Sequence, residues 1–261
     1  MIHSTAIVNN KSKISSNCEI GPYCVIGPDV EIGSNTKLHS HVSIIGNTKI
    51  GSNNEIYPYV SLGTPPQDLK YKGEKNFIII GNNNKLREYV NINPGTTQGG
   101  TVTKLGNNNL LMVYSHVAHD CNIGNNIVLA NNVQVGGHVT IEDNAIVGGS
   151  CAIHQFSRIG QLAMVGGMTG VLSDVIPFGL SLGNRNSLVG LNLIGLRRAK
   201  ILNEEIKLLQ KFYDSVFFDQ NFRANIQNID EELKKNKYVK KIIDFIETDK
   251  KRPISLPENI K

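Results

Sequence analysis

Aliphatic residues recur at every sixth position along most of this chain. The first series has eleven members and no exception: Ile2, Val8, Ile14, Ile20, Ile26, Ile32, Leu38, Ile44, Ile50, Ile56 and Leu62. The register resumes at Ile80, Leu86 and Ile92, and it then holds from Leu105 to Val171. Chance does not give such a series when only 40% of the residues are hydrophobic. A short fixed period of this kind indicates a repeat protein.

Each six-residue unit predicts one short strand followed by a corner. A single unit cannot bury its aliphatic residue, but stacked units form a continuous core. Three units close a coil of 18 residues, and successive coils of strands lie ~4.7–4.9 Å apart. Glycine often follows the aliphatic residue, as at Gly21 and Gly27, and we expect it to supply the positive φ of a tight corner. The predicted fold is a hexapeptide parallel β-helix, whose handedness the period leaves open.

The six-residue register is interrupted twice and ends near Pro177. The interruptions at residues 63–79 and 93–104 predict loops that leave the rigid column, and such loops commonly carry binding residues. From about Leu191 the hydrophobic period becomes helical, with Asn203 as a candidate N-cap followed by acidic residues. We therefore predict an all-β domain over residues 1–190 and an α-helical domain over residues 191–261.

The four cysteines share one position in the repeat. Cys18, Cys24, Cys121 and Cys151 each lie four residues after an aliphatic anchor, in a slot filled mostly by small or β-branched residues. This position predicts buried packing thiols rather than a disulfide or a zinc site.

The net charge of +5 is concentrated toward the C-terminus, where residues 191–261 contain 15 Lys and Arg against 11 Asp and Glu. An acidic partner is one explanation of this excess, and a solvated helix surface is another. The N-terminus does not resemble a signal peptide, and no apolar run approaches the ~20 residues that cross a bilayer. We expect a cytoplasmic protein without a membrane span, and the absence of a basic-aromatic motif argues against nucleic-acid binding.

The 18-residue coil predicts which distant residues meet, because residues one coil apart should lie above one another. Three adjacent columns collect histidines, a carboxylate and glycines: His119, Gly137 and Gln155; Asp120, His138 and Phe156; and Gly136 with His154. His116 belongs to the same coil as His119. Such a cluster predicts a functional site rather than a row of solvated corners.

The predicted cluster has the parts of an acid–base site. An imidazole titrates near neutral pH and can act as a general base, and a neighbouring aspartate can fix its tautomer. We therefore predict that an imidazole of this cluster acts as the base, with Asp120 as its support and the Gly137 N–H as an oxyanion donor. Three histidines could instead bind a metal, as in hexapeptide-repeat carbonic anhydrases, but the spacing of His116, His119 and His138 does not match that site. We expect no metal and no cofactor, since no nucleophile elbow, P-loop or dinucleotide fingerprint is present.

Several segments together resemble one enzyme family. They are QDLKY (67–71), NLLM (109–112), HVAHDC (116–121), LANN (129–132), GH (137–138), IHQF (153–156), MVGG (164–167) and GLRR (195–198). In this order they resemble the bacterial UDP-N-acetylglucosamine O-acyltransferases that start lipid A synthesis. The resemblance covers nearly the whole chain and implies a left-handed β-helix, a homotrimer and active sites between neighbouring subunits.

The resemblance also implies a role for each matching residue. His119 would take the proton from the sugar 3-hydroxyl, which attacks the acyl thioester on acyl carrier protein, and Gly137 would hold the oxyanion. Contacts to the sugar, its phosphates or the acyl hydroxyl would come from Gln67, Asp68, Lys70, His116 and His138. Contacts to the nucleotide end would come from His154, Gln155, Asn192 and Arg198. Gly167 matches the position that limits acyl length, and a glycine there implies room for a longer 3-hydroxyacyl chain.

Other functions remain open on the sequence. The same transfer to a UDP-sugar with a 3-amino group would give an amide instead of an ester. The N-acyltransferase that acts two steps later in the pathway usually has an additional N-terminal domain, and hexads that begin at Ile2 leave no room for it. A metal-dependent hydratase and a non-catalytic scaffold are the alternatives from other classes. Ala199 and Arg185 depart from residues found in relatives.

Overall fold

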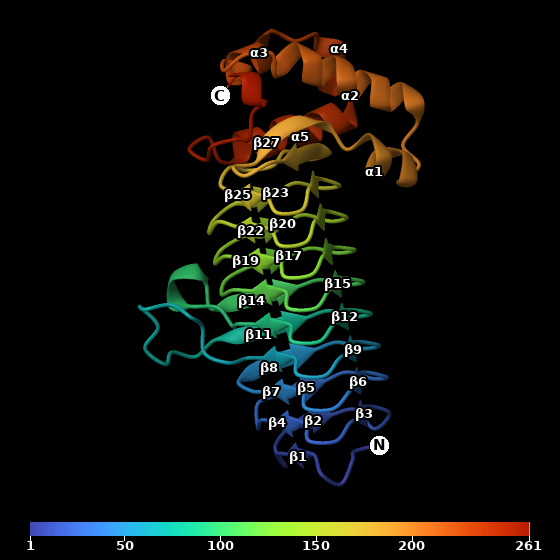
Figure 1. The fold of residues 1–261 in the computed structure, drawn as a ribbon, viewed down its shortest axis with the longest axis vertical. Helices are drawn as coiled ribbons and strands as arrows, with labels where there is room; N and C mark the ends of the chain where they lie inside the picture. The colour runs from blue at the N-terminus through green and yellow to red at the C-terminus, as the bar shows by residue number, and fades with distance from the viewer. Residues whose placement is uncertain (261) are drawn as a thin grey trace.

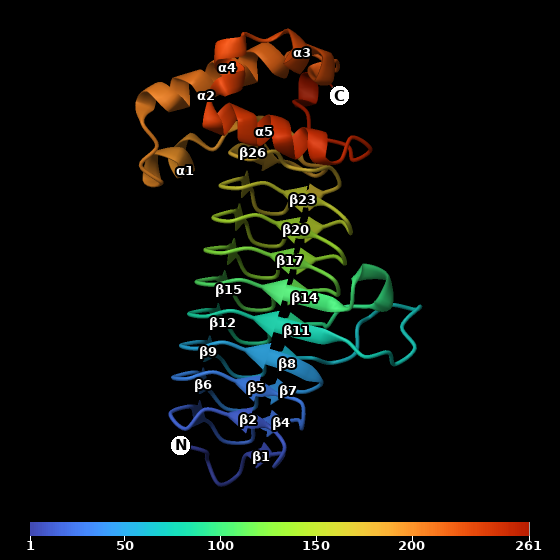
Figure 2. The ribbon, with the colours of Figure 1, turned by 180° about the vertical axis from the view of Figure 1, so that it is seen from behind.

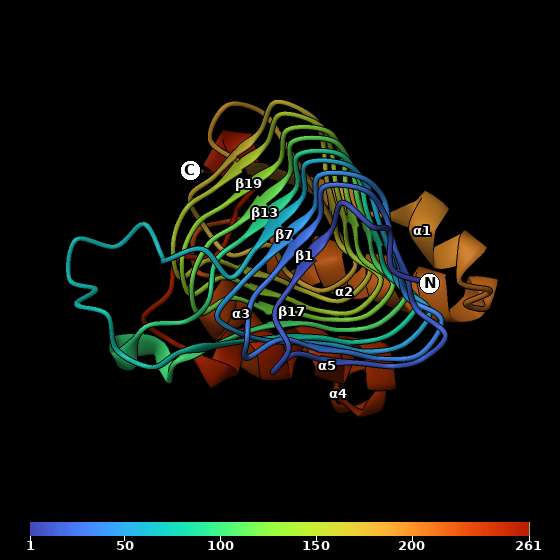
Figure 3. The same ribbon diagram turned by 90° about the horizontal axis from the view of Figure 1, so that it is seen from below.

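The computed structural model describes residues 1–260, and it shows a triangular column of stacked coils with helices at its C-terminal end (Figures 1 and 2). Three parallel sheets form the faces of the column (Figure 3). The coils wind left-handed, so the predicted fold class is confirmed. Neighbouring coils pair 18 residues apart where no loop intervenes, as in the pairing of His116 with Gln134 and of Gln134 with Ala152.

We number the faces by the order in which the chain enters them. Sheet 1 consists of β1 (Ile7–Val8), β4 (Val25–Ile26), β7 (Ser43–Ile44), β10 (Ser61–Leu62), β13 (Asn91–Ile92), β16 (His116–Val117), β19 (Gln134–Val135), β22 (Ala152–Ile153) and β25 (Gly170–Val171). Sheet 2 consists of β2 (Lys13–Ile14), β5 (Glu31–Ile32), β8 (Asn47–Ile50), β11 (Phe77–Ile80), β14 (Val102–Leu105), β17 (Asn122–Ile123), β20 (Thr140–Ile141) and β23 (Arg158–Ile159). Sheet 3 consists of β3 (Glu19–Ile20), β6 (Lys37–Leu38), β9 (Glu55–Ile56), β12 (Lys85–Leu86), β15 (Leu110–Leu111), β18 (Val128–Leu129), β21 (Ile146–Val147), β24 (Met164–Val165), β26 (Gly179–Leu182) and the antiparallel β27 (Ser187–Leu191).

The aliphatic anchors form the core of the column. From Ile20 to Val171 each anchor is buried, and one continuous cluster joins them. A second cluster begins at Ile176 and includes the helices, so the last hairpin packs with the helical region. The division after residue 190 stays a prediction.

The corners use glycine differently from our expectation. Neither Gly21 nor Gly27 has a positive φ, and after Gly21 it is Tyr23, two positions further on, that has one. Gly21 is required by the close approach of the next coil, because a Cβ there would lie 2.7 Å from the carbonyl carbon of His39. The assignment of positive φ to these glycines was therefore wrong, and contact between coils explains them.

The cysteines are free and buried, as predicted. Each thiol also contacts a corner carbonyl of the following coil, for example Cys121 Sγ with Gly136 O at 3.1 Å. Burial raises the pKa of the Cys121 thiol to about 12. The Cys121 thiol is therefore unreactive at neutral pH, and all four thiols satisfy carbonyl groups inside the corners.

Five α-helices cover the C-terminal end of the column: α1 (Leu193–Arg198), α2 (Asn203–Val216), α3 (Phe222–Asn228), α4 (Glu231–Lys235) and α5 (Lys237–Thr248). Short 3-10 turns are η1 (Thr97–Gly99) and η2 (Glu258–Ile260). The N-cap prediction for Asn203 was wrong, since Leu202 is the cap residue and Asn203 is the first helical residue. Within residues 1–260, no helix combines the length and the apolar character that a membrane crossing requires.

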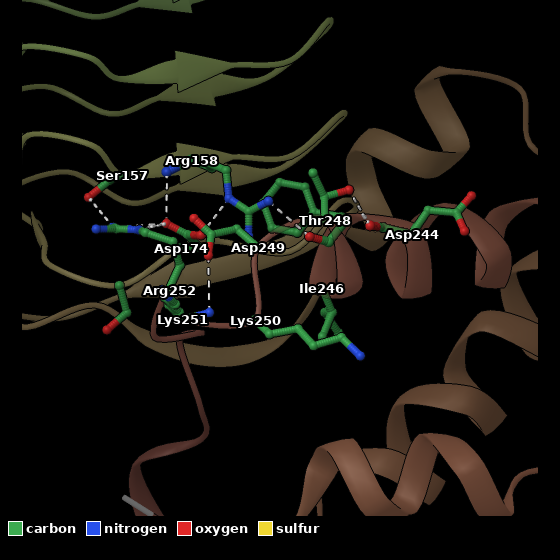
Figure 4. A network of polar contacts seen from close by, with 12 residues as sticks. Ser157, Arg158, Asp174, Asp244, Ile246, Thr248, Asp249, Lys250, Lys251 and Arg252 are labelled. Carbon is green, nitrogen blue, oxygen red and sulfur yellow. Dashed lines mark hydrogen bonds and ion pairs between the residues drawn. The ribbon is translucent and has the colours of Figure 1, made fainter. Parts of the chain in front are cut away.

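A buried ion network joins the column to the helical region (Figure 4). The carboxylate of Asp174 is fully buried and accepts hydrogen bonds from Arg158 Nε at 2.6 Å and Arg252 Nη2 at 3.0 Å. The guanidinium of Arg158 also lies over the Phe245 ring of α5, 4.3 Å from its centroid. One carboxylate therefore holds arginines from the last sheet 2 strand and from the segment after α5.

Candidate active site

The predicted base and its carboxylate lie at the corner between sheets 1 and 2. His119 and Asp120 form the turn between β16 and β17, and Asp120 has a φ of 60°. The distance from His119 Nδ1 to Asp120 Oδ2 is 2.8 Å, and the aspartate side chain is fully buried. The carboxylate accepts a hydrogen bond here, so Nδ1 carries the hydrogen and Nε2 keeps a free lone pair. This tautomer is the one that a general base needs.

Gly137 lies directly against the His119 ring, as the column rule predicted. A Cβ at position 137 would be 2.6 Å from His119 Cε1 and 2.7 Å from Nε2, so only glycine lets the ring occupy this place. Gly137 is buried, and within residues 1–260 no protein acceptor takes its N–H. Buried N–H groups are nearly always paired, so this donor is available for an oxygen of a bound molecule.

His138 and Phe156 complete the same corner one and two coils further on. Their rings stack with centroids 4.4 Å apart, and His138 meets His119 edge to face at 5.1 Å. His138 Nε2 is 3.8 Å from Asp120 Oδ2, too far for a hydrogen bond. The aspartate is thus bonded to His119 and not to His138.

His119, Asp120 and His138 together could form a metal site at this corner. Potential ligand atoms of His119, Asp120 and His138 all lie within 4.8 Å of one another, whereas His116 does not belong to this group. Both oxygens of the Asp120 carboxylate already accept hydrogen bonds from Thr96, and Oδ2 also bonds to His119. A metal would have to displace these bonds, so the geometry favours the acid–base interpretation.

The two predicted loops leave the column at this same corner (Figure 3). They are linked by a hydrogen bond from Lys70 Nζ to Gln98 Oε1 at 3.3 Å, and a hollow of about 560 Å³ lies between them. Asp68 and Lys70 line this hollow, whereas Gln67 is exposed beside it. Asp68 also lies close enough to His138 for its charge to favour the imidazolium. Three predicted substrate residues thus approach the corner from one loop.

His116 and His154, the other two histidines of the predicted cluster, lie on sheet 1 beside the corner. His116 points outward from β16, with its Nδ1 2.8 Å from Asn91 Oδ1. His154 and Gln155 follow β22 two coils above His119, and both side chains are exposed. These residues extend the candidate site along one face of the column.

Three predicted residues lie at other corners. Asn192 caps α1 at the corner of sheets 2 and 3, where its amide contacts Leu162 O and its carbonyl accepts the Gly195 N–H. Arg198 is exposed in the same helix, and Gly167 is exposed at the corner of sheets 3 and 1. A single chain therefore does not bring Asn192, Arg198 or Gly167 to His119.

The buried histidines predict a fall in stability at mildly acidic pH. Burial lowers the pKa of His116 and of His138 from the ordinary value of 6.5. The unfolded chain then binds these protons more readily, so the free energy of unfolding should decrease as pH drops below about 6.5. Urea unfolding between pH 7.5 and 5.5 measures this decrease. His116→Gln should flatten it and His3→Gln should not; an unchanged slope in His116→Gln would refute the assignment.

Sequence reasoning missed the groups that hold Asp120. Thr96 donates to both carboxylate oxygens, and the Thr103 hydroxyl accepts the Asp120 N–H at 2.8 Å. Both threonines lie one coil below. Thr96 lies in the second loop, where the 18-residue register is lost, whereas Thr103 lies in β14, which pairs with β17 in that register. The sequence does indicate that the second loop replaces the corner directly beneath His119, and this position could have pointed to residues of that loop as contacts of Asp120.

Comparison with known proteins identifies the family. A family model described as UDP N-acetylglucosamine O-acyltransferase, domain 2, matches residues 174–255, and one described as bacterial transferase hexapeptide (six repeats) matches residues 11–46 and 103–137. Acyl-[acyl-carrier-protein]–UDP-N-acetylglucosamine O-acyltransferases from Sinorhizobium fredii and Aliarcobacter butzleri are 41% and 46% identical over 98% and 94% of this chain, and 95% and 94% of those proteins. The structure of a UDP-N-acetylglucosamine acyltransferase from Francisella novicida is 38% identical with a TM-score of 0.94, covering 99% of this chain and 95% of that one. The chain belongs to the family of acyl-[acyl-carrier-protein]–UDP-N-acetylglucosamine O-acyltransferases.

Proposed function

We propose that this enzyme transfers a 3-hydroxyacyl chain from acyl carrier protein to the 3-hydroxyl of UDP-N-acetylglucosamine, the first step of lipid A biosynthesis. The names of its relatives support the donor and the acceptor. The observation that carries the mechanism is the His119 ring, bonded to Asp120 through Nδ1 and adjacent to the free N–H of Gly137.

The proposed reaction needs one base and one oxyanion donor. His119 Nε2 takes the proton of the sugar 3-hydroxyl as its oxygen attacks the thioester carbonyl carbon. The Gly137 N–H stabilises the oxyanion of the tetrahedral intermediate. Collapse breaks the carbon–sulfur bond, and the thiolate of the carrier takes the proton from the imidazolium. Asp120 stabilises that imidazolium and keeps its Nε2 directed outward.

The substrate contacts are proposals for the residues around this corner. We assign Gln67, Asp68, Lys70, His116 and His138 to the sugar, its phosphates or the acyl hydroxyl, and His154, Gln155, Asn192 and Arg198 to the nucleotide end. We assign Gly167 to the acyl end, where a Cβ would lie 3.3 Å from Gly149 O and 3.8 Å from Gly149 N. Exposed Arg197, Arg198 and Lys200 give an acidic carrier protein a basic surface.

A homotrimer would bring together predicted site residues that a single chain places at separate corners. The outward residues of sheet 2 are mostly charged or polar, for example Lys49, Lys104 and Asn122. In the upper coils of sheet 3 the outward residues are apolar and half-buried: Leu110, Val128, Ile146 and Met164. In the upper coils of sheet 1 the outward residues are uncharged: His116, Gln134, Ala152 and Gly170. Sheet 3 of one copy packed on sheet 1 of the next would close a ring of three.

This packing would bring Asn192 and Arg198 of a neighbouring copy to the His119 corner. It would also place the corner of sheets 3 and 1 on the threefold axis. That corner carries a stack of mostly exposed rings with neighbouring centroids 4.7–5.0 Å apart: Tyr23, His41, Tyr59, Tyr89 and Tyr114. Exposed aromatic rows of this kind are suited to a protein contact.

Ile146→Lys tests this assembly. A buried, unpaired ammonium in an apolar interface is strongly unfavourable, so we expect the variant to shift from trimer to monomer at micromolar concentration. Light scattering after size exclusion measures the mass, and far-UV circular dichroism checks the fold. Thr140→Lys, on sheet 2 of the same coil, is the matched control and should remain trimeric. A trimeric Ile146→Lys protein would exclude sheet 3 from the interface.

Mass spectrometry of the product tests the reaction. Purified enzyme is incubated with UDP-N-acetylglucosamine and a mixture of 3-hydroxyacyl carrier-protein thioesters. The expected product is a 3-O-acyl ester that mild alkali hydrolyses. Exclusive turnover of the 3-amino analogue, giving an alkali-stable amide, would overturn the ester assignment, and no turnover of either acceptor would overturn the proposed function.

A further inference from the structure

We propose that Thr96 is a positioning residue that holds the Asp120 carboxylate and, through it, the His119 ring. The inference deepens the proposed function, and its consequence for turnover depends on that function. Its structural part, the orientation of one imidazole by a loop threonine, can be measured independently of any substrate.

Thr96 contacts the carboxylate at both oxygens. Its backbone N–H donates to Asp120 Oδ1 at 2.8 Å, and its hydroxyl donates to Oδ2 at 2.7 Å. Oδ2 is also the oxygen that accepts the hydrogen bond from His119 Nδ1. Asp120 is fully buried at its side chain, and Thr96 is 2% exposed, so water does not replace these donors. Thr96 and His119 therefore share one carboxylate oxygen in a dry environment, where hydrogen bonds to a charge are strong.

The loop around Thr96 is shaped to admit this carboxylate. A Cβ at Gly99 would overlap Asp120 Cγ, and a Cβ at Gly95 would lie 2.7 Å from Asp120 Oδ1. The loop crosses so close to Asp120 that neither glycine position has room for a side chain. Because Gly95 and Gly99 both pack against the Asp120 carboxylate, the loop encloses this group rather than passing it by chance.

The backbone of Asp120 is also fixed, while its side chain depends on Thr96. The Asp120 N–H donates to Thr103 Oγ1, which holds the turn. Within residues 1–260, Thr96 and His119 are the groups that hydrogen-bond to the carboxylate oxygens. Without the Thr96 hydroxyl, Oδ2 loses the donor that fixes its position beside the His119 ring, and the Nδ1–H tautomer of His119 loses part of its support.

Thr96→Val is the test because it removes the hydroxyl and preserves the branched shape and the backbone N–H. We expect kcat to fall about tenfold, the size of one lost charge-assisted hydrogen bond, with KM for both substrates within about twofold of wild type. Thr96→Ser keeps the hydroxyl and should retain at least about half of wild-type kcat. Thr101→Val removes a hydroxyl from the same loop that contacts only Gly100 O and should behave as wild type.

A second measurement does not require activity. NMR of ring-¹⁵N-labelled histidine, with His119 assigned by comparison with His119→Gln, reports which ring nitrogen carries the proton. We expect the Nδ1–H form in wild type and a mixture of tautomers in Thr96→Val. Equal kcat in Thr96→Val and wild type, a raised KM with unchanged kcat, or an unchanged His119 spectrum would each overturn the inference. Equal losses in Thr96→Ser and Thr96→Val would also overturn it, because packing and not the hydroxyl would then matter. Absence of turnover in wild type would refute the proposed function alone, and the NMR comparison would still decide the role of Thr96.

Discussion

Alanine in place of His119 is expected to lower kcat by about 10²–10⁴-fold, the contribution typical of a general base. In this variant, no base with a fixed tautomer lies close enough to take the proton of the acceptor hydroxyl. His138 does not replace it, because its Nε2 is 3.8 Å from the Asp120 oxygen and its ring packs face to face with Phe156. The defect should appear in kcat, with KM for UDP-N-acetylglucosamine nearly unchanged.

Steady-state assays with acyl carrier-protein thioester measure this loss. His3→Ala is the matched control, because His3 is exposed at the N-terminal end of the column and its ring bonds to the neighbouring Thr5. Circular dichroism and the oligomeric mass should be unchanged in both variants. A His119→Ala enzyme with less than a tenfold loss of kcat would remove His119 from the proton transfer.

The repeat made the column predictable because one rule decides burial, pairing and proximity together. A single aliphatic slot every six residues determines which residue faces the core, and three slots determine which residues stack. From the sequence alone, that rule places Gly137 against His119, and the structure confirms the contact. It also implies that Gly167, eight units beyond His119, falls at a different corner, since eight is not a multiple of three.

The six-residue rule does not predict contacts where the chain leaves the column, and it does not predict backbone geometry that depends on the neighbouring coil. Thr96 contacts Asp120 from a loop whose path the hexads do not determine. The glycines were misassigned because periodicity reveals a position but not whether φ or close approach selects the residue there. Asn203 was misassigned because Leu202 has the extended conformation of a cap without a capping side chain.

The largest stability effect is expected at Asp174, where the column meets the helical region. Its carboxylate is fully buried and is shared by Arg158 and Arg252, whose side chains are 16% and 20% exposed. Asp174→Ala would leave two mostly buried guanidinium groups without a counter-charge. Removal of one partner from a buried ion pair typically costs about 3–5 kcal/mol, because the remaining charge stays desolvated. The cost should fall on the attachment of the helical region, since the network joins β23 to the segment after α5 (Figure 4).

Urea unfolding followed by far-UV circular dichroism gives the free energy, and hydrogen exchange locates the loss. We expect Asp174→Ala to lower the free energy of unfolding by about 3–5 kcal/mol, with exchange accelerated in α5 more than in the sheets. Asp244→Ala is the matched control, because it removes an exposed partner of Lys240 within α5 and should change stability by less than about 1 kcal/mol. Similar effects of the two variants would mean that the buried carboxylate adds no more than a surface ion pair. The helical region would then be held to the column mainly by the apolar cluster that begins at Ile176.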